Sequence, residues 1–384
     1  MSWKGNILKQ GCDDDRATAE LASNVVPFHS VETGVARPTD DASAIPAGYA
    51  AGADGVYALV VDDAGDVHHV RICSPIAVVG CCRRTDSTGW GRVVELVDPD
   101  NRTHRIILND ADISSTPATL LRPLIDRGLQ IEGSANTKKR LADLLGAWRP
   151  EQMILRVART GWVDDDFNTF VFADGSVIGL KQVILESNTG TIGKAVKVKG
   201  SLDLWRDMVA APCAGNPLML LALSQAFVGP LLGLLKLDGC GFHLHGASTS
   251  GKTTLVKIAA SVWGSPDYHQ SWRATDNALK VAAASCNDAL LPVDEIYEVS
   301  PKILSEVVYM LANGRGKQRM TGAGKGVPVD SWRVASLSNG EISVKERMAS
   351  GGQKIHAGQE IRMIDIQADC RRFRAFDHLV STAE

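Results

Sequence analysis

The stretch Gly246–Thr253 constrains this chain more than any other part, because it matches the pattern G-x-x-x-x-G-K-[ST] at every fixed position. Such a loop functions between a buried strand and a helix. The short alternating run 241–245 favours a strand, and residues 254–263 have the apolar spacing of a helix. The sequence therefore predicts an α/β fold built around a phosphate-binding loop.

The chemistry of this loop predicts its contacts with ATP. Glycines let the backbone wrap a polyphosphate, and the N–H groups at a helix start attract its negative charge. Lys252 is expected to reach the β- and γ-phosphates, and the Thr253 hydroxyl is expected to coordinate Mg²⁺. The residues expected to contact the nucleotide are Gly246, Ala247, Ser248, Thr249, Ser250, Gly251, Lys252, Thr253 and Thr254.

A second chemical element is the apolar run 289–295, which ends in two carboxylates. Ligands bind at the carboxyl ends of buried strands in open α/β sheets. Asp294 is therefore a predicted Mg²⁺ ligand, mostly through water, and Glu295 is predicted to orient or deprotonate the attacking water. Pro292 is unusual for a central strand, which makes the strand's boundary ambiguous.

A third strand is predicted within residues 331–341, and it also ends in polar side chains. A side chain placed between the phosphate loop and the two carboxylates can hydrogen-bond the γ-phosphate or the attacking water. Asn339 is the first candidate for this catalytic role and Ser338 the second. The alternative is that either is an ordinary turn residue with its hydrogen bonds satisfied locally.

Glycines alternate with cations over residues 315–326, a pattern that predicts a hairpin. Lys317, Arg319 and Lys325 are the predicted contacts to a DNA backbone, and a plain solvated hairpin is the alternative.

Arg362 stands in the predicted strand 358–366. It is the predicted arginine finger, which stabilises charge on a phosphate bound by a neighbouring subunit. Arg347 and Arg333 are rivals for this role, and an ion pair within its own domain is the alternative for Arg362.

With 384 residues, the chain is too long for one typical domain. We expect a polar leader or linker over 1–54, a mixed α+β accessory domain over 55–200, and the P-loop ATPase domain over 201–384. The basic clusters at 83–84 and 138–140 are expected to be solvated faces, with phosphate contact as the alternative.

Composition narrows the class of protein further. A net charge of −3 argues against a uniformly basic nucleic-acid binder, although a local basic channel is compatible with it. The eight cysteines lack C-x-x-C spacing, which favours reduced thiols in a cytoplasmic protein.

The uncharged run 217–235 is interpreted as a buried helix rather than a membrane span. His243 and His245 share one strand face and are expected to pack beside the loop, with metal ligation as the alternative.

The order of these motifs resembles the ATPases catalogued as domain of unknown function 927, found in phage, prophage and plasmid proteins, often downstream of a primase-type module. The resemblance covers about residues 55 to 370. It is carried by Gly246, Lys252-Thr253, Trp272, Asp294-Glu295, Leu311-Ala312-Asn313-Gly314, Lys317, Arg319, Trp332-Arg333, Leu337-Ser338, Gly340-Glu341, Gly358-Gln359 and Arg362, and in the first half by Ser74-Pro75, Trp90-Gly91, Gly128-Leu129 and Gly161-Trp162.

That family is similar to superfamily III helicases of the AAA+ class. The resemblance implies a homo-oligomer, expected as a hexameric ring, that hydrolyses ATP at subunit boundaries and moves along single-stranded DNA in a central pore. A primase or other replication protein is the implied partner. In place of the family's usual Ser-Thr-Gly-Glu, this chain has Ser338-Asn339-Gly340-Glu341.

The leading hypothesis is thus a cytoplasmic, Mg²⁺-dependent ATPase and DNA helicase of mobile-element replication. The main alternative is an ATP-driven switch or defence protein that remodels a protein partner. A third is a nucleotide-binding interaction module without turnover.

Overall fold

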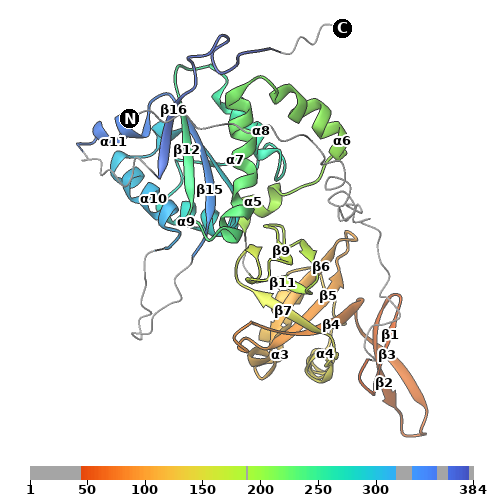
Figure 1. The fold of residues 1–384 in the computed structure, drawn as a ribbon. Coiled ribbons are helices and arrows are strands. Elements are labelled where there is room, and N and C mark those ends of the chain that lie inside the picture. The colour runs from red at the N-terminus through yellow and green to blue at the C-terminus, as the bar shows by residue number, and fades with distance from the viewer. Residues whose placement is uncertain (1–44, 187–188, 317–330, 353–361, 380–384) are drawn as a thin grey trace, which may run out of the picture. The chain divides into compact units, whose positions relative to one another are not determined.

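The computed structural model describes residues 45–186, 189–316, 331–352 and 362–379, all within one compact unit, Ala42–Glu384. Its second half is organised around a five-stranded sheet in the order β13-β14-β15-β12-β16, with every neighbouring pair parallel (Figure 1). The strands are β12 (Cys240–His245), β13 (Gln270–Ser271), β14 (Ala289–Asp294), β15 (Val334–Gly340) and β16 (Met363–Gln367).

Helices cover both faces of this sheet (Figure 1). On β14, Leu290 packs into the core formed with α7 and α8, whereas Leu291 and Val293 pack into the core formed with α9, α10 and α11. Alternate side chains of a strand point to opposite faces, so a strand buried on both sides is apolar throughout. The helices are α7 (Pro217–Leu234), α8 (Lys252–Ala260), α9 (Asp276–Ser285), α10 (Pro301–Asn313) and α11 (Val344–Ala349).

Local sequence signals fix the ends of these helices. The Ser300 hydroxyl accepts the N–H of Ile303 at the start of α10, and Gly314 ends that helix with a φ of 64°. At α11, Ser343 and Glu346 form a reciprocal capping box. Helix α9 begins at Asp276, where the Thr275 hydroxyl accepts the backbone N–H of Ala278.

Pro292 lies inside β14 and pairs with Leu337 of β15. On its other side, β14 pairs with the short β13 only through Val293 and Asp294. Within the described residues, β14 therefore has no strand neighbour beside Pro292 on the β13 side. This explains how a residue without an N–H donor is accommodated in an interior strand.

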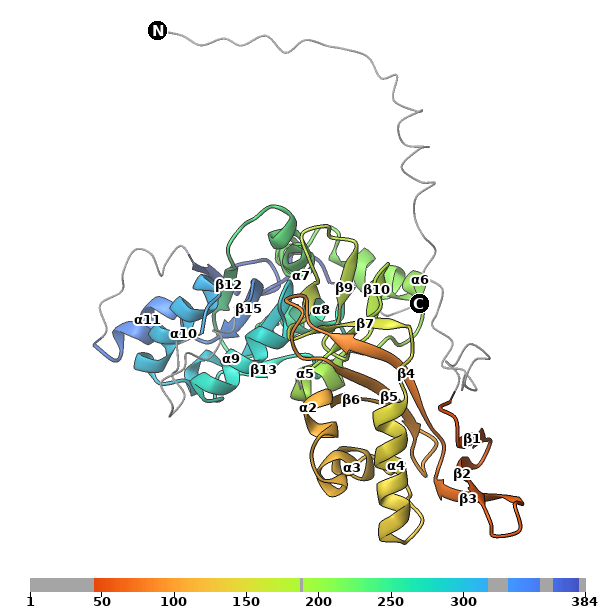
Figure 2. The same cartoon turned by 90° about the horizontal axis from the view of Figure 1, so that it is seen from below.

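The first half contains a five-stranded sheet in the order β11-β7-β4-β5-β6, on which α3 and α4 pack (Figure 2). The apolar face of α3 (Leu120, Leu121, Leu124) and that of α4 (Leu141, Leu144, Leu145) are buried against it. The elements are β4 (Ile76–Arg83), β5 (Gly91–Val97), β6 (Thr103–Asn109), α2 (Asp110–Ile113), α3 (Pro117–Ile125), α4 (Ala135–Ala147), β7 (Met153–Val157) and β11 (Val183–Leu185).

Smaller elements flank this sheet. One three-stranded sheet comprises β1 (Tyr49–Gly52), β2 (Gly55–Val61) and β3 (Val67–Cys73), and another comprises β8 (Gly161–Trp162), β9 (Thr169–Val171) and β10 (Val177–Gly179). Strand β1 lies within the stretch expected to be a leader. It was missed because its pairing with β2 is not visible in the local sequence pattern. Helix α5 (Gly190–Ala195) follows. Helix α6 (Leu202–Trp205) continues into a π-helix (Arg206–Ala210).

Helix α7 is the one helix of the described residues that is long and apolar enough to cross a membrane. It packs on β14, β15 and α8, and Gln225 donates from its buried side to the carbonyl oxygen of Ser336 at 3.2 Å. These contacts bury part of α7 against the ATPase sheet, whereas Leu220, Phe227 and Leu231 of the same helix are exposed, so the expectation of a buried helix is met in part.

Candidate nucleotide-binding site

The phosphate loop joins β12 to α8 and has an unusual backbone. Gly246 has a φ of 147° and Gly251 a φ of 101°, which L-amino acids with side chains rarely adopt. Thr249 is also left-handed, with a φ of 58°. Gly251 is the N-cap of α8, so the first N–H groups of that helix face the end of the loop. This backbone suits an anion such as a polyphosphate.

The Lys252 ammonium group lies within this loop. Its Nζ donates to the carbonyl oxygens of Gly246 at 2.9 Å and Ala247 at 2.7 Å, and to the Ser250 hydroxyl at 3.2 Å. The Lys252 side chain is buried, and a buried charge needs polar partners. The carbonyl and hydroxyl oxygens of the loop provide them. A phosphate would replace these carbonyl oxygens as the acceptor for the same cation.

Asp294 and Thr253 line one cavity, although they come from different elements. The Oδ1 atom of Asp294 is buried and has no hydrogen-bond partner among the described residues. A carboxylate oxygen without a partner beside a hydroxyl is a donor set that suits Mg²⁺, which is a hard cation with oxygen ligands. The two residues predicted as metal ligands therefore lie together and fit the ion.

Glu295 follows β14 in a left-handed conformation, with a φ of 64°. Such backbone strain in a residue with a side chain clusters at functional sites. Burial raises the pKa of the Glu295 carboxyl, and the negative charges of Asp294, Glu298 and Glu341 raise it further. A carboxylate with a raised pKa is a better proton acceptor.

Asn339 connects Thr253, which follows the phosphate loop, to Glu295, which follows β14. Its Nδ2 donates to the Thr253 hydroxyl at 3.2 Å, and its Oδ1 accepts the backbone N–H of Glu295 at 3.2 Å. These contacts are possible because β15 lies between β12 and β14. The side chain predicted to sit between the loop and the carboxylates is therefore placed there.

Ser338 points to the other side of β15. Its hydroxyl accepts the indole N–H of Trp272 at 2.7 Å and lies 3.0 Å from Nδ1 of His243. The Nε2 of His243 lies 2.9 Å from the carbonyl oxygen of Ile342, which can only accept, so Nε2 carries the proton and Ser338 donates to Nδ1. Ser338 thus belongs to a buried structural network.

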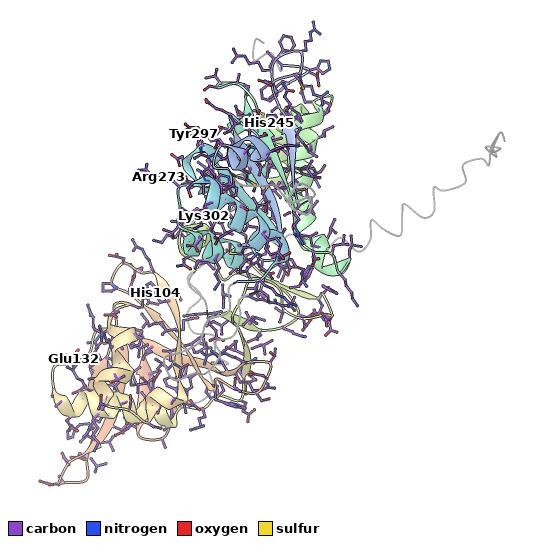
Figure 3. The ribbon with its side chains drawn as sticks, turned by 90° about the vertical axis from the view of Figure 1, so that its left-hand side faces the viewer. His104, Glu132, His245, Arg273, Tyr297 and Lys302 are labelled. Atoms are coloured by element: carbon purple, nitrogen blue, oxygen red, sulfur yellow. The ribbon has the colours of Figure 1, made fainter. Side chains whose placement is uncertain are left out.

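The two histidines of β12 stack, with ring centroids 6.5 Å apart. His245, labelled in Figure 3, directly precedes the loop. Among the described residues, no three or more His, Cys, Asp or Glu side chains are grouped as a metal site would require. His243 is fully buried with Ser338 and Ile342 as its partners, so it packs into that network, and packing beside the loop stays a prediction for His245.

Arg362 lies at the opposite end of the sheet from the loop. Its carbonyl oxygen accepts the N–H of Gly241 at the start of β12, and its guanidinium lies 4.9 Å from the ring centre of Tyr309. Within one chain its charge is therefore stacked on an aromatic ring. Within the described residues the guanidinium stacks on Tyr309, and Arg362 forms no ion pair there.

The two rival arginines have partners as well. Arg347 stacks over Tyr297, which follows the carboxylates of β14 and is labelled in Figure 3, at 4.6 Å from the ring centre. It also donates to the carbonyl oxygen of Val299. Arg333 donates to the fully buried Asp288 at 2.8 Å.

The three predicted DNA contacts, Lys317, Arg319 and Lys325, lie outside the described residues. The residues on either side of them are described, and Arg315 and Ser331 form an antiparallel bridge. The predicted hairpin and its DNA contacts stay predictions.

Residues that sequence reasoning missed follow β16. We call Ala368–His378 the strap. The Asp369 carboxylate accepts the N–H of Ala247 at 2.7 Å, and Arg374 donates to the carbonyl oxygen of Thr249 at 2.8 Å. No local motif marks these residues, because their partners are far away in the sequence.

The sheet order, the loop and the carboxylates at the end of β14 together define an α/β P-loop ATPase-like fold. The chain belongs to the family described as Domain of unknown function (DUF927), which matches residues 49–326. The resemblance inferred from the motifs is thereby confirmed.

Solved structures include similar folds. The SCCmec type IV Cch, described as an active helicase, is 19% identical with a TM-score of 0.65, covering 85% of this chain and 59% of that chain. This chain thus spans about three fifths of that protein, and the likeness shows the fold. The C-terminal region of NrS-1 is 12% identical with a TM-score of 0.32, covering 76% of this chain and 58% of that chain. The S. cerevisiae Hsp104–ADP complex is 16% identical with a TM-score of 0.28, covering 50% and 34%. No curated protein matches this chain.

Proposed function

We propose that this chain is a Mg²⁺-dependent ATPase that couples hydrolysis to movement along single-stranded DNA and its unwinding, in the replication of a phage, prophage or plasmid. The observation that carries the ATPase proposal is the link that Asn339 makes between Thr253 and the backbone of Glu295. The unpartnered oxygen of Asp294 supports it. The likeness to the SCCmec helicase supports the coupling to DNA.

In this mechanism each residue has a separate task. The loop amides and Lys252 bind the phosphates and neutralise their charge. Mg²⁺, held by Thr253 and Asp294, would withdraw charge from the phosphate oxygens. Glu295 accepts the proton of the attacking water.

Asn339 orients the groups around that water. Its Oδ1 holds the backbone at Glu295, and its Nδ2 lies beside the Thr253 hydroxyl. A fixed donor and acceptor at this position reduces the reorganisation needed during hydrolysis.

The proposal also covers domains and assembly. We place the ATPase domain at 201–384 and the accessory domain at 55–200 together with β1, which pairs with β2, so that the leader comprises the residues before Tyr49. The assembly is a cytoplasmic homo-oligomer, expected as a hexameric ring. A cation from the neighbouring subunit completes charge neutralisation. Arg362 remains the predicted source, with Arg347 and Arg333 as alternatives. Lys317, Arg319 and Lys325 are the proposed DNA contacts.

Phosphate release with ATP and Mg²⁺ tests the ATPase. We expect turnover by the wild type and a loss of about a hundredfold or more in Glu295→Gln, which lacks a proton acceptor but still binds ATP. Glu151→Gln, an exposed residue outside the site, is the matched control. Equal inactivity of wild type and Glu295→Gln, with ATP still bound, would indicate a binding module without turnover.

Fluorescence anisotropy with a labelled single strand tests the coupling to DNA. We expect an affinity that falls with salt and with Lys317→Ala, and strand displacement that requires ATP. An active ATPase with no DNA affinity at low salt would favour the switch that remodels a protein partner.

A further inference from the structure

The strap lies beside the phosphate loop and is hydrogen-bonded near both ends of it. The N–H of Ala368 donates to the carbonyl oxygen of His245 at 2.7 Å, just before the loop. The N–H of Ala375 donates to the carbonyl oxygen of Ser250 at 3.1 Å, near the loop's other end. The strap therefore follows the loop over its whole length.

Between these two hydrogen bonds, Arg374 contacts Thr249 in the middle of the loop. Its Nη1 donates to the carbonyl oxygen and to the hydroxyl of Thr249, both at 2.8 Å. Thr249 and Arg374 have φ angles of 58° and 64°, which are costly for residues with a side chain. Two strained residues are thus held in contact with each other.

The residues that follow Arg374 hold the strap in place. The buried Asn216 accepts the backbone N–H groups of Asp377 and His378 through its Oδ1, each at 2.9 Å. Phe376 lies against Gly251, where an added Cβ would come within 2.5 Å of the ring. Arg374 therefore extends from a fixed segment.

The chemistry of a phosphate loop explains the effect of the contact between Arg374 and Thr249. The loop binds phosphate through N–H groups on its inner side, which requires that its carbonyl groups point elsewhere. Lys252 now binds the carbonyl oxygens of Gly246 and Ala247, and it gives them up when it turns to a phosphate. The Arg374 contact with Thr249 is separate from Lys252 and remains available in that state.

We propose that Arg374 is a positioning residue for nucleotide binding, which holds the loop in its phosphate-binding conformation through Thr249. This assignment rests on the proposed function. Arg374 acts on the triphosphate through the loop, so its effect is independent of the nucleoside.

Calorimetry and steady-state kinetics test this assignment in the full chain with Mg²⁺. In Arg374→Ala, we expect the affinities for ATP and for inorganic tripolyphosphate to fall by the same factor, about tenfold, with a raised KM and a nearly unchanged kcat. Arg374→Lys should recover part of the loss. Arg372→Ala is the matched control, because that cation lies over Phe373 in the same strap.

Hydrogen exchange of the nucleotide-free protein is the second measurement. We expect the amides of Gly246–Gly251 to exchange faster in Arg374→Ala than in wild type or Arg372→Ala. Wild-type exchange and ATP affinity in Arg374→Ala would overturn the assignment, as would loss of ATP binding with tripolyphosphate binding intact. Failure of the wild type itself to bind ATP would instead refute the proposed function.

Discussion

The side-chain nitrogen of Asn339 lies 3.2 Å from the hydroxyl oxygen of Thr253. Thr253 is the second residue of α8 and Asn339 the second-last of β15, so the contact joins the helix that follows the phosphate loop to the strand next to β12. Together with the bond from the Glu295 N–H, it links the hydroxyl proposed to bind metal to the backbone of the proposed base.

Asn339→Ala should therefore reduce turnover much more than ATP binding. We expect kcat to fall by roughly tenfold to a hundredfold, since the alanine cannot orient the groups around the attacking water. Phosphate release and calorimetry with ATP measure the two quantities. Asn136→Ala, in α4, is the control and should match the wild type. A kcat like that of the wild type in Asn339→Ala would contradict this role.

Ser338→Ala should instead affect stability. The substitution leaves the Trp272 indole N–H and Nδ1 of His243 buried without their partner, which costs about 1–3 kcal/mol. Urea unfolding followed by tryptophan fluorescence measures this loss. Ser336→Ala, another buried serine of β15, is the control and should lose less. Equal stability of the two variants would rule out the network as a stabilising unit.

Acidification should destabilise the protein through His243. Burial lowers the pKa of His243 from 6.5 to about 4, while the nearby Asp365 carboxylate and the Ile342 carbonyl favour its charged form and His245 and Lys252 oppose it. As the pH falls from 6.5 to 4, the unfolded chain takes up a proton that the folded chain does not. The stabilisation is therefore complete above about pH 6.5 and is lost towards pH 4, by up to about 3 kcal/mol.

Urea unfolding at several pH values between 4.5 and 7.5 measures this effect, taking about 4.5 as the lower practical limit. The variant His243→Gln cannot titrate, so its stability should vary less over this interval, although it is less stable at neutral pH. Parallel curves for the variant and the wild type would mean that other groups cause the acid sensitivity.

Asp288→Ala should be strongly destabilising. The carboxylate is fully buried and accepts from Arg333 at 2.8 Å and from the N–H of Trp162 at 3.1 Å. Its removal leaves a partly buried cation unpaired, which costs about 3 kcal/mol or more. Asp203→Ala, which breaks an exposed pair with Arg206, is the control and should change little. Thermal unfolding of both variants provides the comparison.

Local patterns were enough to predict the elements that carry the proposed phosphate and metal ligands. The glycine spacing of the loop and the buried run before Asp294 each require one kind of structure, and both elements are confirmed. The pattern could not decide between Ser338 and Asn339, because neighbouring residues of a strand face opposite sides and only the finished sheet shows which side holds the loop.

The strap illustrates a different limit. Arg374 and Thr249 are distant in sequence, and each is an ordinary exposed residue by its local pattern. Their contact depends on β16 lying next to β12, which is a property of strand order. Likewise, the stacking of Arg362 on Tyr309 arises from the packing of α10 against the start of β16.

Strand β15 begins just after the segment bracketed by Arg315 and Ser331 and ends at the polar residues beside Thr253. It is hydrogen-bonded to a neighbour on both sides, so it resists bending. A displacement of about an ångström at the Asn339 end would therefore be transmitted along roughly 20 Å of stiff backbone to Val334, at the strand's other end. If the proposed ATPase site is correct, loss of the γ-phosphate would be sensed at both ends of β15.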